Sequence, residues 1–223
     1  MLCFYGGDVM RYFKEIENIN MKDIEVVGKG ISQGKIAIFP TETVYGIGTS
    51  AFDENACKRI YEMKKRPNYK PLIVLVLDKE MLFDIVQKTN DIENKLIERF
   101  WPGPLTIIFE RKDNGKLPDV VTAGKNSVGV RMTDGKIARL LLKKSGVPIV
   151  APSANLSGMP SGTKMSNIIE AFEKKVDYIL DCGDIEDATT STIVKVEGNI
   201  IYVLRQGKVS KEELEQVAQV TII

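Results

Sequence analysis

Helix and strand signals alternate along this chain from end to end, and this alternation narrows its fold more than any other feature. The most apolar run, Leu72 to Leu77, suits a strand that is covered on both faces. Before it, Asp53 is placed to cap a helix that carries Ala56, Ile60 and Met63 on one face. Because strand and helix signals alternate along the chain, the sequence predicts an α/β fold.

Further segments extend this pattern. Helical spacing of apolar residues predicts helices over residues 24–31, 92–100, 136–144 and 168–175, and the capping box Ser210-x-x-Glu213 predicts a C-terminal helix. Short apolar runs predict strands over residues 35–39, 106–109, 128–132, 148–151, 178–180, 192–196 and 201–204. The gap between the last two strands is too short for a parallel crossover. We therefore expect a twisted mixed sheet of parallel and antiparallel strands, flanked by helices.

No linker or repeat interrupts residues 34–206. We expect a single domain over residues 21–223, with residues 1–20 as an N-terminal appendage of uncertain order.

Composition excludes several classes of function. The chain has 31 basic and 30 acidic residues, so a dedicated nucleic-acid binder is not indicated and any basic function must be local. It has no histidine, which excludes Ser-His-Asp and Cys-His catalysis and histidine-containing zinc sites. The three cysteines lie far apart and suggest a reducing compartment. No apolar run approaches the roughly 20 residues that span a bilayer, so we expect a cytoplasmic protein with no membrane partner.

One segment concentrates positive charge. The basic segment, residues 64–70, holds Lys64, Lys65, Arg66 and Lys70 between a helix end and a strand. An arginine fork is suited to phosphate, and the prolines of this region fix the backbone that carries the charges. On charge alone, a solvated face with lysines at the helix C-terminus explains the segment as well as a phosphate site does.

Two polar loops follow strands, where α/β sheets place ligands. Residues 39–48 read as a loop with hydroxyls, a carboxylate and two glycines, and residues 151–158 as a loop rich in Ser and Asn. Simple turns explain both loops equally well.

Arg131 lies inside an apolar strand, so it needs a carboxylate from the protein or from a ligand. Residues 28–35 resemble a phosphate loop in composition. A phosphate loop opens a helix, whereas these residues end one, so we interpret them as a helix C-terminus.

Six motifs occur together, in this order: PTETVYG, KKRPxxKPL, WPGPLT, VGVRM, APSANLSG and STIV with LRQG. In this order they resemble the Sua5/YrdC family of threonylcarbamoyl-AMP synthases, over residues 34–207. The chain is similar to the short, single-domain form. The resemblance implies a YrdC-like domain with a concave, positively charged cavity.

The resemblance also implies roles for individual residues. Lys64 and Arg66 match a pair that holds ATP phosphates, and Lys70 lies beside them. Ser153 and Asn155 match a pair on the nucleotide side. The expected catalytic residues are Lys64, Arg66, Ser153 and Asn155. Other nucleotide contacts are implied at Ser127, Ser161 and Arg205. The implied threonine pocket consists of Thr43, Arg131 and Ser191, with Arg131 on the carboxylate. Leu75 stands where long-form members carry histidine, which weakens the detail of that pocket.

The implied reaction joins L-threonine, bicarbonate and ATP into L-threonylcarbamoyladenylate, with release of pyrophosphate and water. Mg²⁺ is expected on the phosphates, with no dedicated protein metal site. The product would supply a separate transferase complex that modifies the tRNA adenosine beside the anticodon. Two alternatives stay open: a non-catalytic RNA-binding or ribosome-associated protein that uses the same basic cavity, and a carbamoyl-adenylate enzyme with another substrate.

Overall fold

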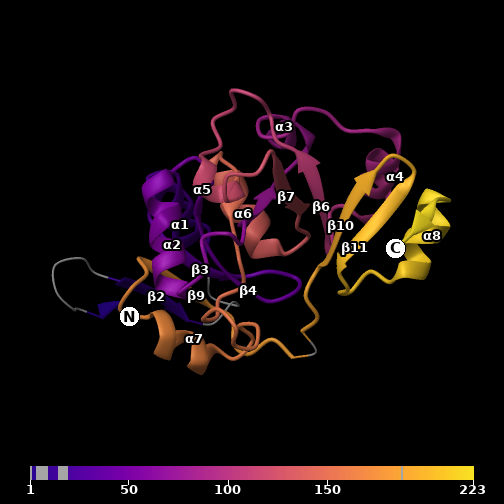
Figure 1. Cartoon of the computed structure of the whole chain (residues 1–223). Helices are drawn as coiled ribbons and strands as arrows, with labels where there is room; N and C mark the ends of the chain where they lie inside the picture. Colours follow the sequence, from indigo (N-terminus) through magenta and orange to yellow (C-terminus); the bar gives the residue numbers. More distant parts are fainter. Residues whose placement is uncertain (1, 4–9, 15–19, 187) are drawn as a thin grey trace.

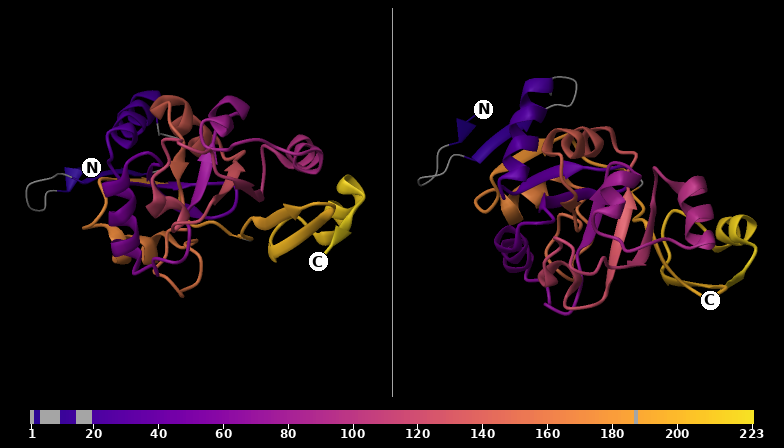
Figure 2. Two further views of the ribbon diagram at one scale, coloured as in Figure 1. Left: turned by 45° about the horizontal axis from the view of Figure 1, so that its top comes forward. Right: turned by 90° about the horizontal axis from the view of Figure 1, so that it is seen from above.

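The computed structural model describes residues 2–3, 10–14, 20–186 and 188–223. Within these residues the strands form one sheet in the order β1-β2-β9-β3-β4-β8-β5-β7-β6-β10-β11-β12. Figure 1 shows helices on both sides of these strands, and in all three views the two termini lie at opposite ends of the molecule (Figures 1 and 2). The expected mixed sheet flanked by helices is confirmed.

The first half of the chain contributes one edge of the sheet and two long helices. Its elements are β1 (Leu2–Cys3), β2 (Met10–Lys14), α1 (Met21–Ser32), β3 (Ala37–Pro40), β4 (Tyr45–Ser50), α2 (Glu54–Lys64), β5 (Ile73–Val76), α3 (Lys79–Phe83) and α4 (Asp91–Phe100). Asn20 caps α1 and Asp53 caps α2, each through its side-chain oxygen.

The second half contributes the other edge of the sheet, several central strands, and β9, which lies between β2 and β3. Its elements are β6 (Leu105–Glu110), α5 (Asp119–Thr122), β7 (Ser127–Met132), α6 (Lys136–Ser145), β8 (Ile149–Val150), α7 (Met165–Phe172), β9 (Tyr178–Asp181), β10 (Thr192–Glu197), β11 (Ile200–Arg205), α8 (Lys211–Ala218) and β12 (Thr221–Ile222). The predicted capping box of Ser210 and Glu213 is formed, and Gly146 ends α6 in the left-handed conformation.

Strand pairing follows the connections. β5 and β7 are parallel, because residues 77–126 are long enough to cross over, while β10 and β11 form the expected antiparallel hairpin. β2 pairs in parallel with β9, so part of the first twenty residues joins the sheet. Residues 4–9 and 15–19 lie outside the described residues, and the domain boundary at residue 20 stays a prediction.

The expected loop over residues 39–48 is partly wrong. Only residues 41–44 form a turn, and Tyr45 to Ser50 continue as β4, antiparallel to both β3 and β8. The glycines that suggested a loop instead allow close strand packing, since a Cβ on Gly48 would lie 2.5 Å from the Val150 carbonyl oxygen. The short helices α3 and α5 were not predicted, because four or five residues carry too little periodicity.

The central sheet has one packed face and one partly open face. Along β10, Thr192, Val194 and Val196 are buried, whereas Ile193 and Lys195 are half-buried. Lys195 is paired with Ile108 of β6, and Ile108 with Gly129 of β7, so these residues share the partly open face. Alternation along β7 places Ser127 and Arg131 on the same face as Gly129. No helix among the described residues is long and apolar enough to cross a membrane.

Candidate active site

A buried arginine marks the end of β7 on this face. Arg131 is 5% exposed, and its Nη1 donates a hydrogen bond of 2.9 Å to Thr43 Oγ1 in the turn between β3 and β4. Thr43 is itself buried, and its hydroxyl lies 2.9 Å from Thr41 Oγ1. The structure thus brings together two residues of the expected threonine pocket, from segments 88 residues apart.

The carboxylate that Arg131 needs comes from the protein. Glu42 Oε1 lies 3.4 Å from Arg131 Nη1, and the hydroxyl of Thr133 donates to Glu42 Oε2. Burial lowers the pKa of Arg131, and the charges of Glu42 and Asp134 oppose that shift. Sequence reasoning did not name Glu42 as a site residue, although the need of Arg131 for a carboxylate and the acid in the PTETVYG motif were both visible.

The third expected pocket residue, Ser191, lies before β10. Its buried hydroxyl is 2.8 Å from Thr106 Oγ1, and Arg205 Nη2 donates to Ser191 O at 2.8 Å and to Ser191 Oγ at 3.1 Å. The pKa of Arg205 is lowered by burial of its guanidinium and by the positive charge of Arg131. The charges of the two arginines therefore lie within electrostatic reach of each other. Arg205, an expected nucleotide contact, thus lies near Arg131 of the expected threonine pocket.

Lys64 joins the basic segment to the Ser153–Asn155 loop. It is the last residue of α2 and is 1% exposed. Its Nζ donates to the carbonyl oxygens of Ser153 and Asn155, both at 2.5 Å, and lies 3.5 Å from Asn155 Oδ1. Burial lowers the pKa of this ammonium to about 7, and the charge of Arg66 adds to the effect. Lys64 thus holds the loop through backbone oxygens.

Arg66 points elsewhere. Its Nε donates to Lys70 O at 3.0 Å and its Nη2 to Pro71 O at 2.7 Å, while Tyr61 OH also donates to Lys70 O. Burial lowers the pKa of Arg66, and Tyr61 partly opposes the shift. Arg66 and Tyr61 line a cleft of about 660 Å³. Lys65 and Lys70 are exposed.

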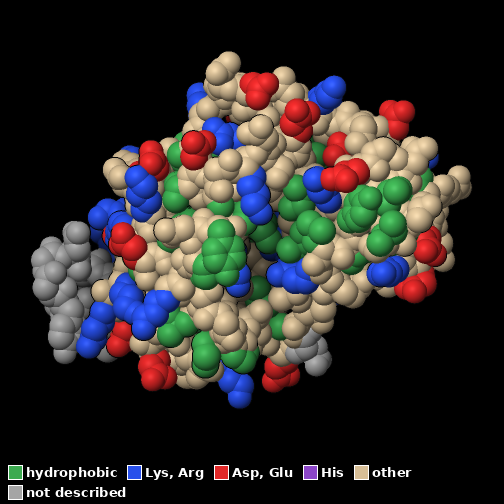
Figure 3. All heavy atoms as spheres, in the orientation of Figure 1, with side chains coloured by type: hydrophobic (Ala, Val, Ile, Leu, Met, Phe, Trp, Pro, Cys, Tyr) green, Lys and Arg blue, Asp and Glu red, His purple; other side chains and the backbone are tan. Residues whose placement is uncertain are grey.

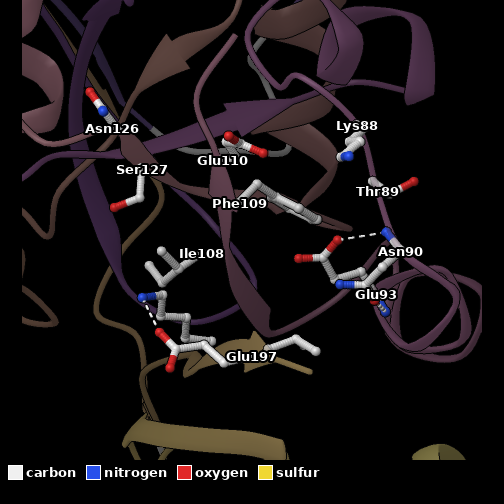
Figure 4. A pocket seen from close by; sticks show the side chains of 12 residues that line it. Lys88, Thr89, Asn90, Glu93, Ile108, Phe109, Glu110, Asn126, Ser127 and Glu197 are labelled. Carbon is white, nitrogen blue, oxygen red and sulfur yellow. Dashed lines mark hydrogen bonds and ion pairs between the residues drawn. The ribbon is translucent and has the colours of Figure 1, made fainter. Parts of the chain in front are cut away.

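Ser127 lies at the far end of β7 from Arg131. Four residue steps along the strand place them roughly 13 Å apart. Ser127 lines a cavity of about 480 Å³ with Glu93, Glu110 and Lys195 (Figure 4). Only a ligand that extends along the strand face can reach both Ser127 and Arg131.

Strand β4 connects the remaining segments. Gly46 is bridged to Ser153, Tyr45 O accepts from Ala154 N at 2.7 Å, and Tyr45 N donates to Gly162 O at 3.0 Å, beside Ser161. The Ser153 hydroxyl donates to Asn155 Oδ1 at 2.5 Å. The loop with Ser153, Asn155 and Ser161 therefore packs directly on the strand that follows Thr43. Figure 3 shows a hollow at the centre of this side of the molecule, bordered by basic and apolar side chains.

Comparison with known proteins supports this assembly of motifs. Residues 29–207 match the Sua5/YciO/YrdC family model, described as "Telomere recombination". The chain is 40% identical over 201 residues to the threonylcarbamoyl-AMP synthase of Pyrococcus abyssi, which covers 90% of this chain and 58% of that protein. It is 37% identical over 206 residues to the putative threonylcarbamoyl-AMP synthase of Methanocaldococcus jannaschii, which covers 92% of this chain and 96% of that protein.

The fold agrees with a solved relative. The crystal structure of P. abyssi Sua5 complexed with L-threonine superposes with a TM-score of 0.89 at 38% identity, over 96% of this chain and 63% of that chain. The chain thus spans about three-fifths of the length of the Pyrococcus protein. Because the family model covers most of the chain and the fold agrees, this chain belongs to the Sua5/YciO/YrdC family.

Proposed function

We propose that this chain is a threonylcarbamoyl-AMP synthase. It would combine L-threonine, bicarbonate and ATP into L-threonylcarbamoyladenylate and release pyrophosphate and water. The names of the Pyrococcus and Methanocaldococcus relatives support this activity, and the threonine complex of P. abyssi Sua5 supports threonine as the amino acid. They favour the synthase over a protein that only binds RNA.

The observation that carries the proposal is the buried Arg131 beside Thr43. Arg131 uses one donor on Thr43, and its Nε has no hydrogen-bond partner. A guanidinium presents five donors in a fork that matches a carboxylate. In our proposal Arg131 binds the carboxylate of threonine, and Thr43 and Ser191 complete the amino-acid pocket.

The nucleotide would lie between this pocket and the basic segment. Arg66 and Lys70 supply positive charge for the phosphates, and Lys64 acts beside them by holding the backbone of Ser153 and Asn155 in place. Ser127, Ser161 and Arg205 are the other proposed nucleotide contacts. Together these residues would make the cavity concave and positively charged.

The chemistry needs little covalent help from the protein. The amine of threonine takes up bicarbonate as an N-carboxylate with loss of water, and this group attacks the α-phosphorus while pyrophosphate leaves. Such a transfer depends on positioning and charge neutralisation, so a chain without histidine can perform it. Mg²⁺ would bind mainly through the phosphates, with few protein ligands.

We further propose that the product passes to a separate transferase complex that modifies tRNA. A cytoplasmic location and direct contact with RNA stay predictions.

The proposed function predicts pyrophosphate release that depends on both co-substrates. Purified protein with ATP, threonine and bicarbonate should release pyrophosphate, and omission of threonine or bicarbonate should abolish the signal. A coupled pyrophosphate assay measures this. Release that ignores both omissions, or no release from the complete mixture, contradicts the proposal.

Two neighbouring variants provide the control. Arg66→Ala should remove turnover, whereas Lys65→Ala, an exposed cation next to it, should keep turnover near the wild-type rate. Equal loss in both variants would indicate that the charge of the whole segment matters and that Arg66 has no special role.

A further inference from the structure

Two buried atoms point to a second recognition element in the amino-acid pocket. Among the described residues, the buried side-chain atoms without a hydrogen-bond partner are Glu42 Oε1 and Arg131 Nε, and both belong to the same ion pair. Buried polar atoms are nearly always hydrogen-bonded, so an unpartnered pair at one site needs an explanation. A ligand that supplies one acceptor and one donor would satisfy both atoms.

The ion pair is held at its outer ends and loose at its centre. Thr133 donates to Glu42 Oε2, and Thr43 accepts from Arg131 Nη1. Between them, Glu42 Oε1 and Arg131 Nη1 are 3.4 Å apart and form no hydrogen bond. Both side chains are nearly covered, at 12% and 7% exposure, so a ligand reaches the two atoms only when the pair separates.

The pair lies among charges of both signs, which suits a ligand that carries both. Burial raises the pKa of Asp134, the charge of Glu42 raises it further, and Lys208 and Arg131 lower it, so these groups lie within electrostatic reach of one another. Glu42 and Asp134 supply negative charge here, and Arg131, Lys208 and Arg205, whose pKa responds to the charge of Arg131, supply positive charge. A zwitterion offers a carboxylate to Arg131 and an ammonium to Glu42, whereas a carboxylic acid that lacks the amine leaves Glu42 Oε1 without a donor.

We propose that Glu42 is a specificity-determining residue that accepts a hydrogen bond from the α-ammonium of the substrate. The inference rests on the proposed function, in which Arg131 binds the carboxylate of threonine. When the zwitterion binds, two ion pairs replace the Glu42–Arg131 pair. The carboxylate of the ligand pairs with Arg131, and its ammonium pairs with Glu42 Oε1. In this structure Glu42 and Arg131 pair with each other. Glu42 thus selects α-amino acids over carboxylic acids that lack the amine.

Calorimetry on the full chain tests this inference, with an ATP analogue that has a methylene bridge between the α and β phosphates present throughout. Two ligands are compared: L-threonine and its analogue with a hydroxyl in place of the amine. Wild-type protein should bind threonine roughly 10- to 100-fold more tightly than the analogue, as expected for a charged hydrogen bond. Glu42→Gln keeps the shape and removes the charge. It should weaken threonine binding and leave binding of the analogue unchanged or tighter.

Other outcomes separate the possible failures. Equal weakening of both ligands in Glu42→Gln would assign Glu42 a structural role only and overturn the inference. Wild-type protein that binds both ligands equally would overturn it without any variant, which keeps the test decisive if Glu42→Gln does not fold. Wild-type protein that binds neither ligand contradicts the proposed function itself. Glu215→Gln, an exposed change on α8, should leave both affinities at their wild-type values.

Discussion

Lys64 illustrates at the scale of a residue how one cation can organise a site without facing solvent. Its ammonium is 1% exposed and donates to the carbonyl oxygens of Ser153 and Asn155. Those oxygens have fixed positions because the loop also pairs with β4 through Gly46. Lys64 and β4 therefore hold the backbone of the loop together, and a nucleotide bound there would depend on Lys64 even without touching it.

Lys64→Met should destabilise the protein and weaken nucleotide binding. Each buried carbonyl left without a donor costs about 1–3 kcal/mol. Urea unfolding measures the loss, and Lys65→Met, an exposed change next to it, should cost less than about 0.5 kcal/mol. Equal losses in both variants would contradict the role of Lys64 in the loop.

The free energy of unfolding of Lys64→Met should also depend on pH differently from that of the wild-type protein. Burial lowers the Lys64 pKa from 10.5 to about 7 in the folded chain. Between these values the unfolded chain binds more protons, so the free energy of unfolding rises with pH across this window. Wild-type protein should gain this increment between pH 7 and pH 9.5, and Lys64→Met should not. The stability difference between them should therefore grow with pH.

Strand β4 has the corresponding role at the scale of an element. It runs between β3 and β8, and its first residues hold the Ser153 loop and Gly162. Its position depends on glycine, since a Cβ on Gly48 would lie 2.5 Å from Val150 O and 2.9 Å from a side-chain carbon of Phe39. β4 thus connects the turn that carries Thr43 to the loop that carries Ser153.

Gly48→Ala should therefore destabilise the protein by about 1–3 kcal/mol, as for overpacking of a core. Gly46→Ala in the same strand is the matched control, because its Cβ would meet Ala151 Cβ at 3.4 Å, an ordinary contact. Thermal and urea unfolding of the two variants checks the difference. A Gly46 variant as unstable as the Gly48 variant would mean that strand glycines matter here for reasons other than contact with β8.

At the scale of the whole molecule, ligands should stabilise the fold by binding only the folded chain. ATP and threonine should each raise the melting temperature of wild-type protein. Arg131→Lys keeps the charge and loses the fork, so it should keep the ATP increment and lose most of the threonine increment. Differential scanning fluorimetry measures both. Loss of the ATP increment alone would assign Arg131 to the nucleotide.

Much of this architecture could be predicted from the sequence, because local signals and tertiary structure agree. The strand over residues 72–77, the caps Asp53 and Ser210 and the end of α6 at Gly146 all follow from local chemistry. The partner of Arg131 could not be predicted, since a pairing between residues 42 and 131 depends on how β4 and β7 are arranged in the sheet. For the same reason, Lys64 could be recognised as a cation of interest but not as a buried one.

The burial of Lys64 and Arg131 has a consequence for how the site responds to dissolved ions. Mobile ions screen exposed charges at roughly 10 Å in 0.1 M salt, but they screen buried pairs far less. Lys65 and Lys70 lie exposed at the surface of the same region. Rising ionic strength should therefore weaken the long-range attraction of a triphosphate while the frame that Lys64 and Arg131 hold together persists. Screening would slow the arrival of the nucleotide more than it would disturb the pocket that receives it.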